Sequence, residues 1–386
     1  MADKTAKLEV VESNNQFTTN LYNVLSKSSS GNIIFSPISV HAVLSMAYQG
    51  ARGTTAEKFA STLNIAEANI AGEGYNIVMN HLNSVPNVTL LMANKVYLME
   101  GHQLLPDFSE AVTKNFLSEV QLLNFGANEA AAATINAWVE DKTKEKIKDL
   151  INKDDLDDLT RLVLVNAIYF KGSWLYKFDK EETKIEPFYL NDVDSVDVQM
   201  MHINRHFHYK PVEELDAALL ELPYTNTDFC MFIILPFKRN DIDELEKKLA
   251  NVNLIEITNK MWHVKVTVAF PKFKIEQTID LNKSLTKLGL GEIFDPHTAN
   301  FSGMITSKEP LYVSKIIQKA FIEINEEGAE AAAATEMTIM AKDCCIEEMS
   351  PDIFFIADHP FVLVLLETSA GKPNILFAGK IMKPEH

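Results

Sequence analysis

The residues of this chain whose types and spacing could perform chemistry are few. The best metal-ligand candidates are His202, His206 and His208, of which the last two would share one face of a β-strand. Two imidazoles at that spacing can bind Zn²⁺, but no neighbouring residue supplies an obvious third and fourth ligand. Polar histidines on a sheet surface are the favoured interpretation, and we expect neither a metal nor a cofactor.

Signatures of catalysis are missing from the sequence. There is no Gly-x-Ser-x-Gly elbow, His-Glu-x-x-His helix, Walker loop or Cys-x-x-Cys pair. Cys230 lies in the apolar run 227–235, which is typical of a buried strand, so we interpret it as a core residue. The adjacent Cys344 and Cys345 are poorly placed for a mutual disulfide and are expected to be free thiols, with a redox role as the alternative. The sequence therefore predicts that the chain is not an enzyme.

Charge and composition limit the partners. The formal net charge of −17 disfavours binding to nucleic acid or anionic lipid, and no apolar run of 18 or more residues could span a membrane. Four alternating lysines could bind a glycosaminoglycan, but acidic residues are interleaved with them, so a solvated helix face is favoured. These lysines are Lys142, Lys144, Lys146 and Lys148.

The segment 325–342 carries the most informative pattern. Every second residue of its central part is small or uncharged. These residues are Ala329, Ala331, Ala333, Thr335, Met337 and Ile339. Glu330 and Glu336 fall on the other parity, so a strand here could bury one face and leave its charges in water. Propensity alone favours a helix over 329–338. A segment that is exposed in one state and a buried strand in another satisfies both interpretations.

The elements that must position this segment form a mixed set. Helical periodicity marks 8–28, 38–64, 105–118 and 128–151. Strand patterns mark 90–98, 160–170, 196–210, 217–236, 263–276, 311–325 and 361–382. Helices gather early and strands late, which indicates an α+β fold. No linker or repeat divides the 386 residues, so we expect a single domain over 1–386.

Motifs from about residue 10 to the C-terminus resemble those of the serpin family and follow the family's order. They lie at 32–39, 46–55, 165–174, 271–276, 357–361 and 376–380. The first is similar to the segment under the family's central sheet. The third is similar to the strand that leads to the point where loop insertion starts. The sequence of 318–323 resembles invertebrate, insect-like serpins more than vertebrate ones.

The resemblance implies three β-sheets, eight to nine helices and an exposed reactive-centre loop at about 328–357. In serpins a protease cleaves this loop and stays acylated while the hinge inserts into the central sheet as a new strand. The hinge would comprise Glu326, Glu327, Gly328, Ala329, Glu330, Ala331, Ala332, Ala333, Ala334 and Thr335. The shutter and breach residues near the sheet would be Ser36, Ser39, Asn166, Trp174 and Gln318. Gln318 replaces a histidine found in many members, and a glutamine can both donate and accept hydrogen bonds.

The family's spacing also implies a reactive bond. Counting from Gly328 reaches Lys342–Asp343, and a lysine there would suit the acidic pocket of a trypsin-like serine protease. Counting back from Pro360 reaches Met349–Ser350 instead. We prefer the first count, because insertion fixes the hinge length while the downstream segment is free to vary. The expected covalent partner of this monomer is a trypsin-like serine protease; inhibition of cysteine proteases and a non-inhibitory role are the alternatives.

The compartment is the least constrained property. No apolar stretch typical of a signal peptide follows Met1, which is compatible with a mature extracellular form or with a cytoplasmic protein. Asn87, Asn282 and Asn300 begin Asn-x-Ser/Thr sequences, a weak indication of secretion. We expect an extracellular protein, with the cytoplasm as the alternative.

Overall fold

A computed structural model describes residues 2–307, 309–328, 352–369 and 372–385. The α-helices in these residues are α1 (Ala2–Ser26), α2 (Pro37–Gly50), α3 (Gly53–Leu63), α4 (Ala68–Ser84), α5 (Pro106–Phe116), α6 (Asn128–Lys142), α7 (Ile242–Leu249), α8 (Leu254–Ile257) and α9 (Asn282–Leu285). The first seven strands are β1 (Ile33–Phe35), β2 (Val88–Met99), β3 (Val120–Leu123), β4 (Leu162–Gly172), β5 (Lys184–Tyr189), β6 (Ser195–Val212) and β7 (Ala217–Pro223). The others are β8 (Phe229–Pro236), β9 (Trp262–Pro271), β10 (Phe273–Asp280), β11 (Val313–Ile324), β12 (Ile353–Ile356), β13 (Phe361–Glu367) and β14 (Asn374–Ile381).

The strands of the described residues form two hydrogen-bonded sheets. One has five strands in the order β10-β11-β4-β2-β3, and the other has nine, in the order β1-β14-β13-β8-β7-β6-β9-β12 with β5 paired to β6. The resemblance to the serpin family had implied three sheets. The count differs because β6 is 18 residues long: it pairs with β9 over 200–209 and with β7 over 209–212. One strand thereby joins what would otherwise be two smaller sheets.

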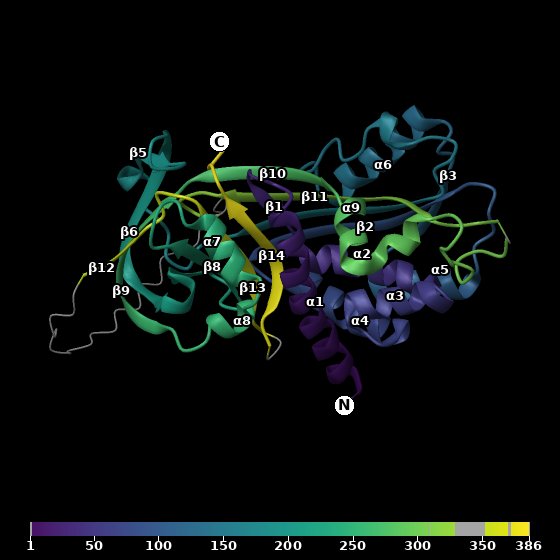
Figure 1. The fold of residues 1–386 in the computed structure, drawn as a ribbon, viewed down its shortest axis with the longest axis horizontal. Coiled ribbons are helices and arrows are strands. Elements are labelled where there is room, and N and C mark those ends of the chain that lie inside the picture. The colour runs from purple at the N-terminus through teal and green to yellow at the C-terminus, as the bar shows by residue number, and fades with distance from the viewer. Residues whose placement is uncertain (1, 308, 329–351, 370–371, 386) are drawn as a thin grey trace.

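The five-stranded sheet lies between two helical layers (Figure 1). On one face α6 packs Ala131, Ile135 and Val139 against side chains of β2, β4 and β11. On the other face α2 lies within the main core, together with side chains of both sheets. Strand β4 is therefore buried on both faces, which explains why its sequence is an almost continuous apolar run rather than an alternating one.

Helix α2 is the buried support beneath this sheet. Every side chain of the helix except that of Gln49 is buried, as its apolar sequence on all sides predicts. Pro37 occupies the first turn, where a missing N–H costs no hydrogen bond. The few polar residues of α2, such as Ser39 and His41, must consequently find hydrogen-bond partners inside the core.

Two predicted helices are shorter in the structure. The helix expected over 38–64 divides into α2 and α3, because Ala51 and Arg52 between them are extended and Gly53 follows with a left-handed φ of +57°. The helix expected over 128–151 ends at Lys142, and Lys144 and Glu145 follow with positive φ values. The four alternating lysines therefore do not lie on one helix face.

Helix α4 was not predicted from the sequence. Its glycines lower helix propensity, but Gly74 has a packing reason. A Cβ atom at Gly74 would lie 2.5 Å from the carbonyl oxygen of Ala6 in α1. Tertiary contact between α1 and α4 therefore requires a residue that local propensity disfavours.

The helices of the described residues also bear on membrane insertion. None of them combines the length and the apolar character needed to cross a bilayer.

His41 makes the core sensitive to acid. Its Nε2–H donates to the Leu63 carbonyl at 3.1 Å, and its Nδ1 accepts from the Tyr75 hydroxyl at 2.8 Å, so the ring is neutral. Burial lowers the pKa of His41 from 6.5 to about 4, against a smaller opposing effect of the Leu63 carbonyl. The unfolded chain therefore binds a proton at this residue between those two values, while the folded chain does not.

We predict that stability falls as the pH is lowered from 6.5 to 4. The His41 contribution is complete above pH 6.5, and about 3 kcal/mol of it is lost across this window. Urea unfolding at pH 7 and pH 4.5 measures the loss, which should be smaller in His41→Gln. The exposed His297 provides the control, since His297→Gln should keep the wild-type dependence. Full acid sensitivity in His41→Gln would assign the effect to another group.

Candidate functional site

The site is built around two parallel strands, β4 and β11. They pair directly from Leu162 with Val313 to Phe170 with Ile322, and no described strand lies between them. Their outer neighbours β2 and β10 are antiparallel to them. A chain that leaves the end of β11 and turns back could enter between the two as a strand antiparallel to both. Such a strand would gain a hydrogen-bond ladder on each side.

A buried polar network joins β4 and β11 at their middle. Gln318 of β11 lies opposite Asn166 of β4 and donates from Nε2 to its Oδ1. Gln318 also donates to the Ser36 carbonyl at 2.9 Å and accepts from the Ser36 N–H at 3.0 Å. Asn166 Nδ2 in turn donates to Ser39 Oγ. The start of α2 is thus bonded to both strands at the point where they would separate.

Asn94 of β2, which was not predicted from the sequence, completes the network. It lies opposite Asn166, and its Oδ1 accepts from Asn166 Nδ2 and, at 2.9 Å, from Ser39 Oγ. An asparagine in the middle of a largely apolar strand was the signal that could have revealed it, because buried polar groups need partners. We call Ser36, Ser39, Asn94, Asn166 and Gln318 the shutter network.

The chain that follows β11 is held against the end of β4. The N–H groups of Trp174 and Phe178 donate to the carbonyls of Glu327 and Glu326 at 3.1 and 2.9 Å. The Trp174 indole N–H donates to the Asn325 carbonyl at 2.9 Å. Trp174, which was predicted to be a breach residue, therefore contacts the start of the predicted hinge segment, at the end of β4 beyond the shutter network.

Gly328 closes a tight turn at this point. Its N–H donates to the Asn325 carbonyl at 3.1 Å, and its φ is +79°. A Cβ atom here would lie 2.5 Å from the Trp174 nitrogen and 2.6 Å from the Gly172 carbonyl oxygen. Only glycine fits, for both conformational and steric reasons.

Ion pairs fix the two acidic hinge residues. Glu326 pairs with Lys272 at 3.1 Å and accepts from the Thr183 hydroxyl at 3.0 Å, while Glu327 pairs with Lys180 at 2.6 Å. Burial raises the pKa of Glu326, but its backbone amide, Lys272 and Thr183 outweigh this effect and hold the pKa below its ordinary value. The hydrogen bond and charge of Glu327 raise the pKa of Lys180. At neutral pH the described part of the hinge is therefore held by charged contacts. The predicted residues from Ala329 to Thr335, and Lys342 and Asp343, lie outside the described residues.

The candidate metal ligands lie apart from this site. His202 pairs with Glu186 at 3.0 Å, and His208 pairs with Glu221 at 3.1 Å. His206 and His208 both face His263 of β9, with ring centroids 5.5 and 5.2 Å away. Among the described residues, no group of three or more His, Cys, Asp or Glu side chains is placed to hold a metal ion.

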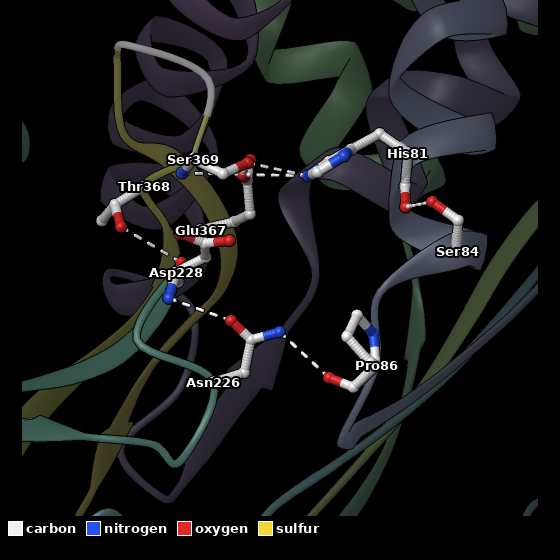
Figure 2. Close-up of polar contacts among 8 residues, drawn as sticks. All are labelled: His81, Ser84, Pro86, Asn226, Asp228, Glu367, Thr368 and Ser369. Atoms are coloured by element: carbon white, nitrogen blue, oxygen red, sulfur yellow. Dashed lines mark hydrogen bonds and ion pairs between the residues drawn. The ribbon is translucent and has the colours of Figure 1, made fainter.

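One group of side chains has the composition of a hydrolase triad but not its geometry. Ser369, His81 and Glu367 lie together where the end of β13 meets α4 (Figure 2). Both the Ser369 hydroxyl, at 2.8 Å, and the Glu367 carboxylate, at 3.2 Å, contact the same atom, His81 Nε2. A catalytic triad uses the two ring nitrogens for the two partners.

Elsewhere, burial raises the pKa of Cys230, so its thiol is protonated and inert, as expected for a core residue.

Comparison with known proteins agrees with this architecture. Residues 12–384 match the family model for Serpin (serine protease inhibitor). The chain belongs to the serpin family. It is 37% identical over 382 residues to leukocyte elastase inhibitor of Equus caballus, covering 96% of this chain and 98% of that protein. It is 36% identical over 387 residues to alaserpin of Manduca sexta, covering 100% of this chain and 96% of that protein.

Solved serpin structures share the fold. The crystal structure of Serpin48 from the insect Tenebrio molitor has a TM-score of 0.87 at 32% identity, covering 97% of this chain and 98% of that one. The predicted α+β serpin fold is confirmed, and so is family membership. The matched family model describes serine protease inhibitors and the similar proteins are serpins rather than catalysts, so the prediction that the chain is not an enzyme is confirmed as well.

We predict that Gln318→Leu destabilises the protein by about 3 kcal/mol. The substitution leaves the N–H and carbonyl of Ser36 and the Asn166 Oδ1 atom buried without this partner, at about 1 kcal/mol or more each. The exposed Gln103 provides the matched control, and Gln103→Leu should change stability by less than about 0.5 kcal/mol. Denaturant unfolding compares the two variants. Equal stabilities would show that the shutter network does not hold the sheet together.

Proposed function

We propose that this serpin is a suicide-substrate inhibitor of trypsin-like serine proteases with its reactive bond at Lys342–Asp343. The observation that carries the proposal is the direct parallel pairing of β4 and β11, with the hinge turn leaving the end of β11. A cleaved loop could enter between these strands, and the family's inhibitors trap the acyl-enzyme in this way.

The turn sets the register that an inserted strand would take. With Asn325–Gly328 as the turn, Ala329 would lie opposite Ile324, and Thr335 would then lie opposite Gln318. Directly paired residues of an antiparallel ladder share a face. Ala329, Ala331 and Ala333 would therefore face the core side, where Ala320, Ile322 and Ile324 already pack. Small side chains are what this crowded layer can accept.

Insertion of the cleaved loop would also release enough free energy to move a tethered protease. About 14 residues at ~3.3 Å each would move the tethered protease by roughly 45 Å. New ladder hydrogen bonds at ~1 kcal/mol net each would release on the order of 10 kcal/mol. The native, uncleaved state would accordingly be metastable. A trypsin-like target follows from Lys342, because the acidic base of that pocket pairs with a cationic side chain.

The proposal extends to the oligomeric state, the site of action and the source of this serpin. We propose a monomer of one serpin domain over 1–386, since one continuous core joins side chains of both sheets. We further propose an extracellular site of action and an invertebrate source. The exposed asparagines of two Asn-x-Ser/Thr sequences support an extracellular site of action. The amino-acid sequence of 318–323 supports an invertebrate source.

The decisive experiment mixes the protein with trypsin. We predict a band at the summed mass that survives boiling in SDS, and a released C-terminal fragment beginning at Asp343. Lys342→Ala should abolish the adduct, because the carboxylate of the trypsin pocket would lose its partner. A fragment beginning at Ser350 would move the reactive bond to Met349. Free turnover of the loop would favour a non-inhibitory serpin, and adducts with cysteine proteases alone would favour the other alternative.

A second prediction tests insertion itself. Ala329→Arg would place a guanidinium in an apolar slot at a cost of several kcal/mol, so insertion should lose to deacylation. The variant should be cleaved at nearly the wild-type rate and form little adduct, as scored by the stoichiometry of inhibition. Glu330→Arg is the control, because that side chain would stay in solvent and inhibition should persist. Equal inhibition by the two arginine variants would contradict the proposed register.

A further inference from the structure

The three Asn-x-Ser/Thr sequences lie in different structural surroundings. Each has the composition of an N-glycosylation acceptor, for which a hydroxyl two residues after the asparagine is required. A folded protein can carry a glycan only where the asparagine amide is accessible and is not needed elsewhere. The structure separates the three on this criterion.

Asn87 has an accessible amide. It lies in the turn between α4 and β2, is exposed, and has a φ of +61°. No hydrogen bond of its side chain is formed within the described part of the chain. The turn itself is anchored on both sides: Asn226 donates to the Pro86 carbonyl at 3.0 Å (Figure 2), and Val88 pairs with Gly172. A glycan here would leave these contacts intact.

Asn300 has similar access. Its backbone N–H donates to the Thr55 hydroxyl at 3.0 Å, and its carbonyl accepts from the Arg52 N–H at 2.9 Å. The side chain is exposed, and only its Oδ1 atom is engaged, by the Ser302 N–H at 3.2 Å. Within the described residues the Nδ2 atom, to which a sugar would attach, makes no hydrogen bond.

Asn282 is occupied at both ends of its amide. Its Nδ2 donates to the Ser314 carbonyl at 2.8 Å, and its Oδ1 accepts from the Ile316 N–H at 2.9 Å. These bonds join α9 to the first residues of β11. The third residue of the sequence, Ser284, is buried. A sugar would replace one of the two Nδ2 hydrogens of this half-buried amide, next to the Ser314 carbonyl, and would crowd the contact between α9 and β11.

We infer that Asn87 and Asn300 are N-glycosylation sites and that Asn282 is a structural residue that stays unmodified. The donor is an oligosaccharide linked to a lipid through pyrophosphate. The amide nitrogen forms a bond to C1 of the first sugar, the C1–O bond to the pyrophosphate breaks, and the nitrogen loses one proton. The reaction occurs in the secretory pathway, so its occurrence in nature rests on the proposed extracellular location. The choice of sites rests on the acceptor sequences and on the exposure and hydrogen bonds of their asparagines.

To test this inference, the full chain is fused to an N-terminal leader peptide and secreted from insect cells. The glycans are then mapped by glycopeptide mass spectrometry. We expect glycans at Asn87 and Asn300 and none at Asn282. Thr89→Ala and Ser302→Ala should each remove one glycan, and Ser284→Ala should remove none. These variants keep the asparagines in place and change only the acceptor sequence. A glycan at Asn282, or its absence from Asn87 or Asn300, would overturn the inference.

A second comparison tests the structural role of Asn282. Asn282→Gln should lower the melting temperature by about 3 °C or more, because the amide clamp on β11 is lost. Asn87→Gln should change it by less than about 1 °C. Equal melting temperatures would contradict the clamp. Inhibition of trypsin by the same preparations is scored separately, so failure of the proposed inhibitory function leaves the glycan result readable.

Discussion

The contact between Gln318 and Asn166 is the constraint on which the rest of the structure depends. It ties β4 to β11 in the buried middle of the sheet, where the two strands are direct neighbours about 4.8 Å apart. To admit another strand, the two must move to about twice that distance, and this hydrogen bond must break. In the interior, such a bond is broken without compensation from water, so it resists opening far more than a surface contact would.

Helix α2 and the neighbouring strand are arranged around this contact. Ser36 and Ser39 reach the network from the start of the helix, and Asn94 reaches it from β2. Every member bonds to at least one other element, so separating β4 from β11 disturbs the contacts of both strands with α2 and β2. That behaviour suits a protein whose proposed action requires a sheet to stay closed until its loop is cut.

The hinge is restrained by a different kind of force. Lys180 pairs with Glu327 at the surface, and Lys272 pairs with the more buried Glu326. The exposed Lys180–Glu327 pair contributes little to stability because water and salt screen it. The tight fit of Gly328 against Trp174 fixes where the chain turns, while the buried shutter network determines how hard the sheet is to open. The position of the turn and the resistance of the sheet to opening are thus determined by separate residues.

The sequence determined the class of the fold, the family and most of the residues around the opening of the sheet. The motifs around Ser36, Asn166 and Gln318 carried the resemblance to the family, and the apolar patterns of the helices and strands indicated the fold class, because local patterns report which face of an element is buried. Only the tertiary structure decided which polar groups meet. Asn94 belongs to the network through cross-strand register, α4 forms despite its glycines because Gly74 packs against α1, and β6 merges two sheets through its length. Asn282 is excluded as a glycan acceptor by bonds to residues 32 and 34 positions away. Each of these depends on contacts between segments distant in sequence, which neither periodicity nor propensity records.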